Sequence, residues 1–331
     1  MGCPVKLGRT TDFYAFGAET IIRPHHRARL LDFRASAARR GAMSSPLFSI
    51  ALCLLSAVTV AATNLFVKKG GDVLSTRMVV SVAMALSVLP FAPFVPMPTP
   101  TVWAALGLSV MVHWFYQFAM VRALHRGDLS LVFPVMRGLA PLLTAITATI
   151  FLNETPNLIG WTGLIVATTA LIVFALPEDD GKAHQSLKRS ALIWAAITAF
   201  GIAGYSVADA NGARLAAHAG SFATFIVWLF LFDWIGITCA MIYARRGRVW
   251  ADIKPQISDG TIAGVLGTIS YGSALWAFTL TEAANVTAIR ETSVVFGAFF
   301  GAIFLKESFG KRRVIAAAIL AAGLLMLEFS A

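Results

Sequence analysis

Four ionisable side chains lie inside long apolar stretches of the chain: Arg137, Asp233, Arg290 and Glu291. A charged side chain surrounded by hydrocarbon costs at least about 2.5–3.5 kcal/mol, so each one must face a cavity or a partner. The planar guanidinium of arginine can donate two hydrogen bonds to one carboxylate. A buried carboxyl group can be a fixed counter-ion, or it can bind and release a proton. These residue types favour binding of a polar or anionic small molecule over bond-breaking chemistry.

The two arginines occur in matching passages of the sequence. The first passage is Leu129–Glu154 (LSLVFPVMRGLAPLLTAITATIFLNE), and the second is Glu282–Glu307 (EAANVTAIRETSVVFGAFFGAIFLKE). Arg290 lies 153 residues after Arg137, and the same offset aligns the final glutamates of the two passages. Two similar halves with one buried charge each are typical of a membrane protein with an internal, pseudo-symmetric site.

Polar side chains in other apolar stretches could complete such a site. The third stretch places a histidine, a tyrosine and an amide on one helical face, and the eighth offers a tyrosine. A serine follows the second arginine by three residues, so both would share a face of a continuous helix. A few oriented polar groups on an apolar wall are typical of small-molecule sites. The predicted substrate-binding residues are Arg137, Arg290, His113, Tyr116, Gln117, Tyr271 and Ser293.

The two buried acids have more than one candidate role. Glu291 could be the fixed counter-ion of an arginine such as Arg137, which is the role we favour, or it could carry a proton. Asp233, in the seventh apolar stretch, is the other acid placed for ion pairing or coupling. A purely structural ion pair with one of these acids is the competing interpretation of both arginines.

Tyr205 and Asp209 are i, i+4 neighbours near the end of the sixth apolar stretch. We regard them as gate candidates, or else as a hydrogen-bonded pair at a helix end. The cysteines Cys3, Cys53 and Cys239 have no metal-ligand spacing, and the six histidines do not cluster. We therefore expect neither a metal nor another cofactor.

Helices that span a membrane must position these residues. Of the 331 residues, 57% are apolar and 13% are charged, and the mean hydropathy is +0.73, too apolar for one soluble core. A bilayer core about 30 Å thick needs roughly 20 apolar residues per helix. Ten such stretches occur, at Leu47–Phe66, Met78–Val95, Val102–Val121, Leu129–Leu152, Leu158–Leu176, Ala191–Ala210, Phe222–Tyr243, Ile262–Leu280, Ala283–Leu305 and Val314–Phe329.

The odd number of stretches in each half sets the relative orientation of the halves. Residues 44–177 contain five stretches, residues 178–189 form a polar linker, and residues 190–331 contain the other five. The second five therefore begin on the opposite side of the membrane. We predict an all-α membrane protein with ten transmembrane helices, arranged as two inverted five-helix repeats around a central cavity. Residues 1–43 form a basic extension that we expect to be disordered.

The net charge of +10 comes mainly from short loops and from the basic extension, so we expect no nucleic-acid partner. Loops on one side of the predicted helices carry 16 Lys and Arg residues, and loops on the other side carry one, Arg214. The positive-inside rule would place the sixteen in the cytoplasm and both termini outside. The basic extension favours the reverse, so the sequence leaves the sidedness open.

Several passages resemble the drug/metabolite transporter superfamily in its ten-helix form with two EamA domains. Arg122–Ile146 (RALHRGDLSLVFPVMRGLAPLLTAI) joins the third and fourth stretches as in that family. Each half then has an FLNE or FLKE end followed by a Gly/Ala-rich last stretch. Tyr205–Arg214 (YSVADANGAR) is similar to a passage at the sixth helix of some bacterial members. The resemblance covers about residues 47–329.

This resemblance implies a secondary transporter that moves a small metabolite, amino acid or drug-like compound across the bacterial inner membrane. It implies alternating access, export, and a monomer or homodimer in the lipid bilayer, with a proton as a candidate coupling ion. The alternatives are a membrane-embedded enzyme, although the buried charges form no convergent acid–base set, and a non-transporting scaffold. The second half departs from the family pattern, because Pro134 and Pro141 have no counterpart at Thr287 and Val294.

Overall fold

The structure is a computed structural model, and its described residues form helices and connecting turns without a strand. The described residues are 46–69, 71–126, 129–175, 189–304 and 311–328. The predicted basic extension, nearly all of the predicted linker and the glutamate of the FLKE end lie outside these ranges.

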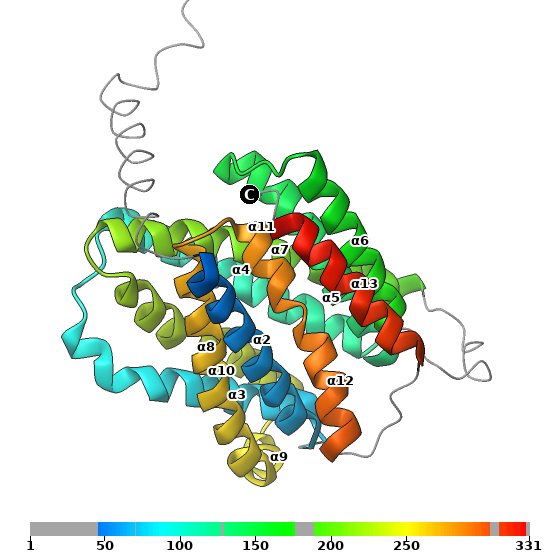
Figure 1. The fold of residues 1–331 in the computed structure, drawn as a ribbon. Helices are drawn as coiled ribbons and strands as arrows, with labels where there is room; N and C mark the ends of the chain where they lie inside the picture. The colour runs from blue at the N-terminus through cyan, green and yellow to red at the C-terminus, as the bar shows by residue number, and fades with distance from the viewer. Residues whose placement is uncertain (1–45, 70, 127–128, 176–188, 305–310, 329–331) are drawn as a thin grey trace, which may run out of the picture. The chain divides into compact units, whose positions relative to one another are not determined.

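Helices occupy the positions of the apolar stretches in both halves (Figure 1). The first half contains α2 (Pro46–Lys69), α3 (Val73–Val88), the 3₁₀ helix η1 (Leu89–Phe94), α4 (Pro100–Leu124), α5 (Leu129–Leu152) and α6 (Leu158–Ala175). The second half contains α7 (Arg189–His218), α8 (Phe222–Arg245), α9 (Val249–Ile253), the 3₁₀ helix η2 (Lys254–Gln256), α10 (Ile257–Phe278), α11 (Ala283–Arg290), α12 (Ser293–Phe304) and α13 (Lys311–Glu328).

Seven helical segments of the described chain are long and apolar enough to cross a membrane. They begin at Pro46, Val73, Pro100, Val135, Arg189, Phe222 and Val249. Leu158–Phe174 is apolar but shorter. The predicted ninth stretch is divided between two short helices, so neither part alone has the length of a span. The count of ten transmembrane helices therefore stays a prediction.

Two helix ends differ from the ends of the predicted apolar stretches, one near Arg77 and the other near Tyr205 and Asp209. The second helix begins at Val73 rather than at Met78, so Arg77 belongs to the helix and not to a loop. The sixth helix continues to His218 rather than ending at Ala210, because small and apolar residues extend its helical sequence. Tyr205 and Asp209 consequently lie inside α7 and do not mark its end.

The predicted ninth stretch is not one continuous helix, because the chain turns tightly between α11 and α12. The Glu291 N–H bonds to the carbonyls of Thr287 at 3.2 Å and Ala288 at 3.1 Å, and the Val294 N–H bonds to the Glu291 carbonyl at 3.0 Å. The Thr292 hydroxyl donates to the Ile289 carbonyl at 2.7 Å. Hydroxyl side chains that bond to nearby backbone in this way compete with the helical hydrogen bonds.

The FLNE end of the first half terminates α5 through a backbone turn. Asn153 has a φ of 56°, in the left-handed region that asparagine tolerates. The Glu154 N–H then bonds to the Ala148 carbonyl of the last helical turns at 3.2 Å. Glu154 is thereby placed just beyond the helix, where its carboxylate can reach the second half of the chain.

Helices of the two halves pack mainly against each other. Helix α7 packs on α4 and α5, α3 packs on α8 and α10, and α6 packs along α13 (Figure 1). Gly163 and Gly323 lie at the α6–α13 contact, and a Cβ added to either would come within 2.8 Å of the other's carbonyl oxygen. This reciprocal contact between small residues lets the two helices approach closely.

Many large apolar side chains cover the outside of the helices, while polar ones are buried. Leu158 is 82% exposed and Phe151 is 71% exposed, whereas Asp209 is fully buried and Glu291 is 1% exposed. A water-soluble protein rarely exposes so many large apolar residues. Together with the apolar helices, this distribution is that of a multi-pass membrane protein.

Candidate functional site

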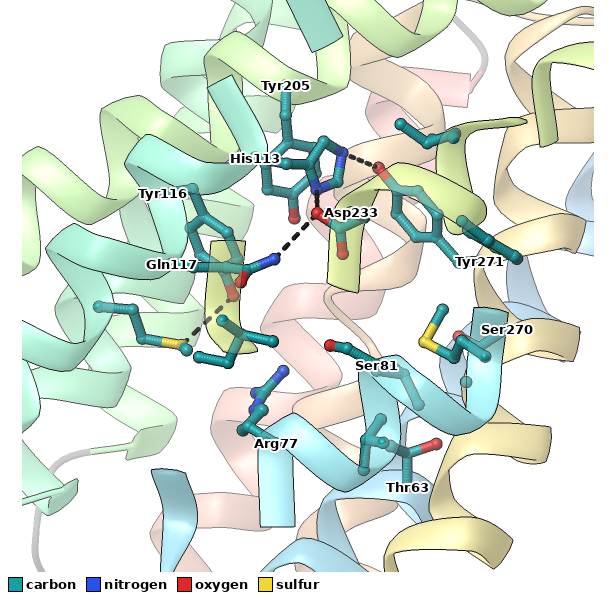
Figure 2. Close-up of a pocket in the computed structure, with 18 of the residues that line it drawn as sticks. Thr63, Arg77, Ser81, His113, Tyr116, Gln117, Tyr205, Asp233, Ser270 and Tyr271 are labelled. Atoms are coloured by element: carbon teal, nitrogen blue, oxygen red, sulfur yellow. Dashed lines mark hydrogen bonds and ion pairs between the residues drawn. The ribbon is translucent and has the colours of Figure 1, made fainter. Parts of the chain in front are cut away.

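A cavity lies where helices of the two halves meet, and α2, α3, α4, α5, α7, α8, α10 and α11 all contribute to its wall (Figure 2). Its apolar lining includes Val60, Val80, Leu229 and Ile237. Its polar lining residues are Thr63, Asn64, Arg77, Ser81, His113, Tyr116, Gln117, Arg137, Tyr205, Asp233, Ser270, Tyr271 and Arg290.

A histidine between two carboxylates is the centre of one wall. His113 Nε2 lies 3.0 Å from Asp209 Oδ2, and His113 Nδ1 lies 3.6 Å from Asp233 Oδ1. The Gln117 amide donates to Asp233 at 2.9 Å, and the Tyr271 hydroxyl lies 3.3 Å from His113 Nε2 (Figure 2). We call His113, Asp209 and Asp233 the acid–histidine cluster.

The two acids of this cluster have different surroundings. Asp209 is fully buried and accepts hydrogen bonds from the hydroxyls of Ser109 and Tyr271. Asp233 lines the cavity, and its side chain is 19% exposed. Asp209 is therefore held by protein donors, whereas Asp233 can also meet a ligand or water.

Aromatic rings form a continuous surface around His113. The Tyr205 ring stacks on the imidazole with ring centres 4.4 Å apart and planes at 25°. Tyr116 meets Tyr205 edge to face at 5.1 Å, and Tyr271 meets His113 edge to face at 5.7 Å. These contacts fix the orientation of the imidazole and give the cavity a flat, partly apolar wall.

Arg137 is neutralised by an acid of the other half. Its Nη1 lies 2.9 Å from Oε1 of Glu291, at the turn between α11 and α12. The Arg137 side chain lines the cavity and is 15% exposed, while Glu291 does not line it. The second carboxylate oxygen of Glu291 is buried without a hydrogen-bond partner among the described residues.

Arg290 has neutral partners instead. Its Nε donates to the Ser56 hydroxyl at 2.9 Å, and its guanidinium lies 5.2 Å from the centre of the Tyr271 ring. Ser270 links Ser56 to α10 by donating to the Ser56 carbonyl at 2.8 Å. Arg290 is only 7% exposed, and no described carboxylate lies within 4.0 Å of it.

The structure brings together most of the side chains that the sequence singled out. Arg137, Arg290, His113, Tyr116, Gln117, Tyr271, Tyr205 and Asp233 line the cavity. Asp209 and Glu291 lie behind it, in contact with His113 and Arg137. Ser293 is buried but is not among the lining residues, because the turn after Arg290 interrupts the helical face that the two were expected to share.

Sequence reasoning missed Arg77, Asn64, Ser81 and Ser56. Arg77 directly precedes the predicted start of the second stretch at Met78, and apolar windows locate helix ends too poorly to assign it to the helix. Hydroxyl and amide side chains such as Ser56 and Asn64 are common in membrane helices, so their type alone carries no signal. Among the described residues, no three His, Cys, Asp or Glu side chains gather as metal ligands.

Ion pairs also join the halves at two places away from the cavity. Beyond the end of α5, Glu154 pairs with Arg214 of α7, and its carboxylate accepts the Ala283 N–H at 2.8 Å. Arg214 also donates to the carbonyls of Phe278 at 2.8 Å and Thr281 at 2.9 Å. We call these contacts the Glu154 network, and they connect α5, α7 and the α10–α11 turn.

Glu282 lies next to the Glu154 network and outside the candidate spans. Burial raises the pKa of the Glu282 carboxyl above its ordinary value, and the neighbouring Glu154 raises it further. Arg214 opposes both effects by lowering that pKa. The turn before α11 therefore carries an acid whose ionisation is disfavoured by its surroundings.

A second network joins the halves at the start of α3. Arg245, at the end of α8, pairs with Asp72 at 2.6 Å and lies 3.5 Å from Asp252. The Ser75 hydroxyl donates to Asp72 at 2.5 Å. Arg245 and Asp72 are both about one-third exposed, so solvent screens this Asp72 network more than the Glu154 network.

The sequence profile of the EamA-like transporter family matches residues 47–176 and residues 189–329. No curated protein matches the chain significantly. One solved structure, titled "Crystal structure of protein", has a TM-score of 0.61 and 16% sequence identity. The match covers 84% of this chain and 95% of that one. At this identity the likeness concerns the fold alone.

Proposed function

Because the chain belongs to the EamA-like transporter family of the drug/metabolite transporter superfamily, we propose that it is a secondary transporter for a small polar molecule. The cavity between the two family repeats is the observation that carries the proposal, since both repeats contribute charged side chains to it. Buried ionisable residues that face a cavity in a membrane protein usually mark a substrate or ion pathway.

The proposed mechanism is alternating access by two inverted five-helix repeats within ten transmembrane helices. Two features support the inversion: the reciprocal contact of Gly163 and Gly323, and the placement of the two arginines on equivalent helices of the halves. The Glu154 and Asp72 networks both join one half to the other. Opening the cavity to one side requires the halves to separate there, so one network would break in each state.

The substrate would place an anionic or strongly polar group against Arg290. Arg137 already has Glu291 as its counter-ion, whereas the partners of Arg290 within the described chain are the Ser56 hydroxyl and the face of Tyr271. A buried guanidinium without an acid is costly, and a bound carboxylate or phosphate would compensate its charge with two hydrogen bonds. His113, Tyr116, Gln117 and Tyr271 would orient the rest of the molecule on the aromatic wall.

Tyr205 and Asp209 would act as gating residues through their contacts in the cavity wall. Tyr205 covers the imidazole of His113, and Asp209 fixes the Tyr271 hydroxyl. A shift of α7 relative to α4 would therefore move both rings together. The family resemblance favours export across a bacterial inner membrane, by a monomer or homodimer.

The experiment that tests this function uses vesicles that contain only this protein. A thermal-shift screen against a metabolite library would first identify a stabilising compound, because a ligand of the folded state raises the melting temperature. Vesicles preloaded with that compound should then take up its radiolabelled form in exchange, and Arg290→Gln should abolish both stabilisation and exchange. Binding without any exchange by the wild-type protein would overturn the transporter proposal.

A further inference from the structure

In the acid–histidine cluster, two carboxylates face one imidazole, and a neutral imidazole cannot donate a hydrogen bond to both. His113 faces Asp209 with Nε2 at 3.0 Å and Asp233 with Nδ1 at 3.6 Å. A neutral imidazole carries one N–H, so it can donate toward only one of the two carboxylates. The other imidazole nitrogen then presents a lone pair to a carboxylate oxygen. This contact becomes favourable only when a second proton lies between the nitrogen and the oxygen.

We propose that the acid–histidine cluster binds one exchangeable proton and that this proton is the coupling ion of the transport cycle, an inference that rests on the proposed transport function. This argument holds for both neutral tautomers of His113, because each of them leaves one imidazole nitrogen without a proton facing a carboxylate. The proton is shared by the cluster as a unit, as an imidazolium between two carboxylates or as a carboxylic acid beside a neutral imidazole.

The exchangeable proton enters and leaves through Asp233. Asp209 is fully buried, where water does not reach it, and it already accepts hydrogen bonds from the hydroxyls of Ser109 and Tyr271. Asp233 lines the cavity with a partly exposed side chain. Asp209 therefore acts as the positioning residue for His113, and Asp233 is the group in contact with the cavity.

Charged side chains of α3, α5 and α11 line the cavity beside this cluster. The two carboxylates attract an added proton, whereas cations on the cavity wall repel it, so occupancy responds to the charges that the cavity holds. Tyr271 connects the cluster to the proposed anion position, because its hydroxyl contacts Asp209 and its ring contacts Arg290. The other charged or titratable groups on this wall are Arg77, Arg137, Tyr116 and Tyr205.

Proton and substrate compete at Asp233. Among the described residues, Asp233 is the only carboxylate that lines the cavity, so a hydrogen-bond donor of the substrate that needs a carboxylate must bind there. The proton occupies the same oxygens or the adjacent imidazole nitrogen. Competitive binding at one alternating site produces exchange of substrate for proton, which is the coupling required for export driven by an inward proton gradient.

The first test uses the proton as the only ligand. Infrared difference spectra after a pH jump would be recorded on the whole protein in phosphatidylethanolamine–phosphatidylglycerol vesicles. The wild type should show carboxyl or imidazole bands that change with pH, and these bands should be lost in Asp233→Asn and in His113→Gln. Glu282→Gln is the matched control, because this acid of the turn before α11 does not line the cavity and its removal should leave these bands in place. Spectra of Asp233→Asn and His113→Gln that equal the wild-type spectrum would overturn the proposal.

The second test separates the proton site from transport itself. With the compound found by the exchange assay, wild-type accumulation should rise when a proton gradient is imposed across the vesicle. The residual transport of Asp233→Asn should be independent of the gradient, and residual transport that still follows it would refute the coupling role. Wild-type vesicles that exchange nothing would instead refute the transport function, while the infrared bands would still report on proton binding.

Discussion

The two arginine helices occupy equivalent places in the repeats but have different structures. Helix α5 is continuous through Pro134 and Pro141, whereas its counterpart contains no proline and is divided into α11 and α12 immediately after Arg290. Proline would have been the expected cause of a break. Here Glu291 and Thr292 form the turn, and the Thr292 hydroxyl donates a hydrogen bond to a backbone carbonyl of the preceding helix.

Both helices nevertheless lose a regular backbone hydrogen bond at the arginine. Pro141 has no N–H, so it cannot donate to the carbonyl four residues earlier, which is that of Arg137. In the second half the turn after Arg290 has the same consequence. The two repeats thus weaken the helix at equivalent positions by different chemistry, which fits a mobile element next to the cavity.

The counter-ions differ as well. The residue of the first half that aligns with Glu291 is Gly138, where an added Cβ would lie 2.7 Å from the Ile172 side chain. Glycine at this position lets α5 approach α6, whereas glutamate in the second half neutralises Arg137. One acid therefore pairs with the arginine of the opposite repeat, whereas Arg290 has no described carboxylate within 4.0 Å.

The largest expected effect is that of Glu291→Gln, because it removes the counter-ion of Arg137. Loss of one partner of a buried ion pair costs about 3–5 kcal/mol, so the melting temperature in detergent should fall by several degrees. The double variant Arg137→Gln/Glu291→Gln should be less destabilised than the sum of the two single variants. A Glu291→Gln protein as stable as the wild type would show that the pair is not structural.

Conservative substitution of the two arginines should separate their roles. Arg290→Lys keeps the charge but loses the planar pair of donors, and a charged hydrogen bond is worth about 1.5–3 kcal/mol. We expect substrate affinity to fall at least about tenfold, with the melting temperature unchanged. Arg137→Lys should weaken transport less, because its charge is already paired. Equal losses in both variants would contradict the assignment of the anion position to Arg290.

The contact between the last helices of the repeats should be equally sensitive from either side. Gly163→Ala would place a Cβ 2.6 Å from the Gly323 carbonyl oxygen, and Gly323→Ala would place one 2.7 Å from the Ala167 nitrogen. Overpacking of this kind costs about 1–3 kcal/mol, measurable as a lower melting temperature. Gly297→Ala, whose added Cβ meets no described atom within 4 Å, is the matched control. Different costs for Gly163→Ala and Gly323→Ala would contradict a reciprocal contact.

The sequence predicted the side chains of the cavity better than the helices that carry them. Charges and polar groups inside apolar stretches must face inward, so His113, Arg137 and Asp233 could be found from residue type alone. The start of α3 before Arg77 could not be found, because apolar windows locate helix ends poorly. The division between α11 and α12 depends on local hydrogen bonds and on Arg137 from another helix, and apolar periodicity contains neither.

The smallest expected effect concerns the point where the two arginine helices meet, since Glu154 beyond α5 binds the first N–H of α11. Burial and Glu154 raise the pKa of Glu282, so ionised Glu282 destabilises the folded state, and this destabilisation is relieved as the pH falls through the raised pKa. Glu282 is about half buried, so solvent screening limits its effect to a few tenths of a kcal/mol. Glu282→Gln should therefore be slightly more stable than the wild type at pH 7, and the difference should vanish on acidification.

Glu154→Gln is the informative partner variant, because it removes the ion pair with Arg214. It should lower stability at pH 7 and reduce the effect of Glu282→Gln. Melting curves of the wild type, the two single variants and the double variant between pH 4 and pH 8 measure this coupling. A Glu282→Gln protein that is less stable than the wild type at pH 7 would mean that Glu282 is held by a favourable ion pair, and that the start of α11 depends on two acids instead of one.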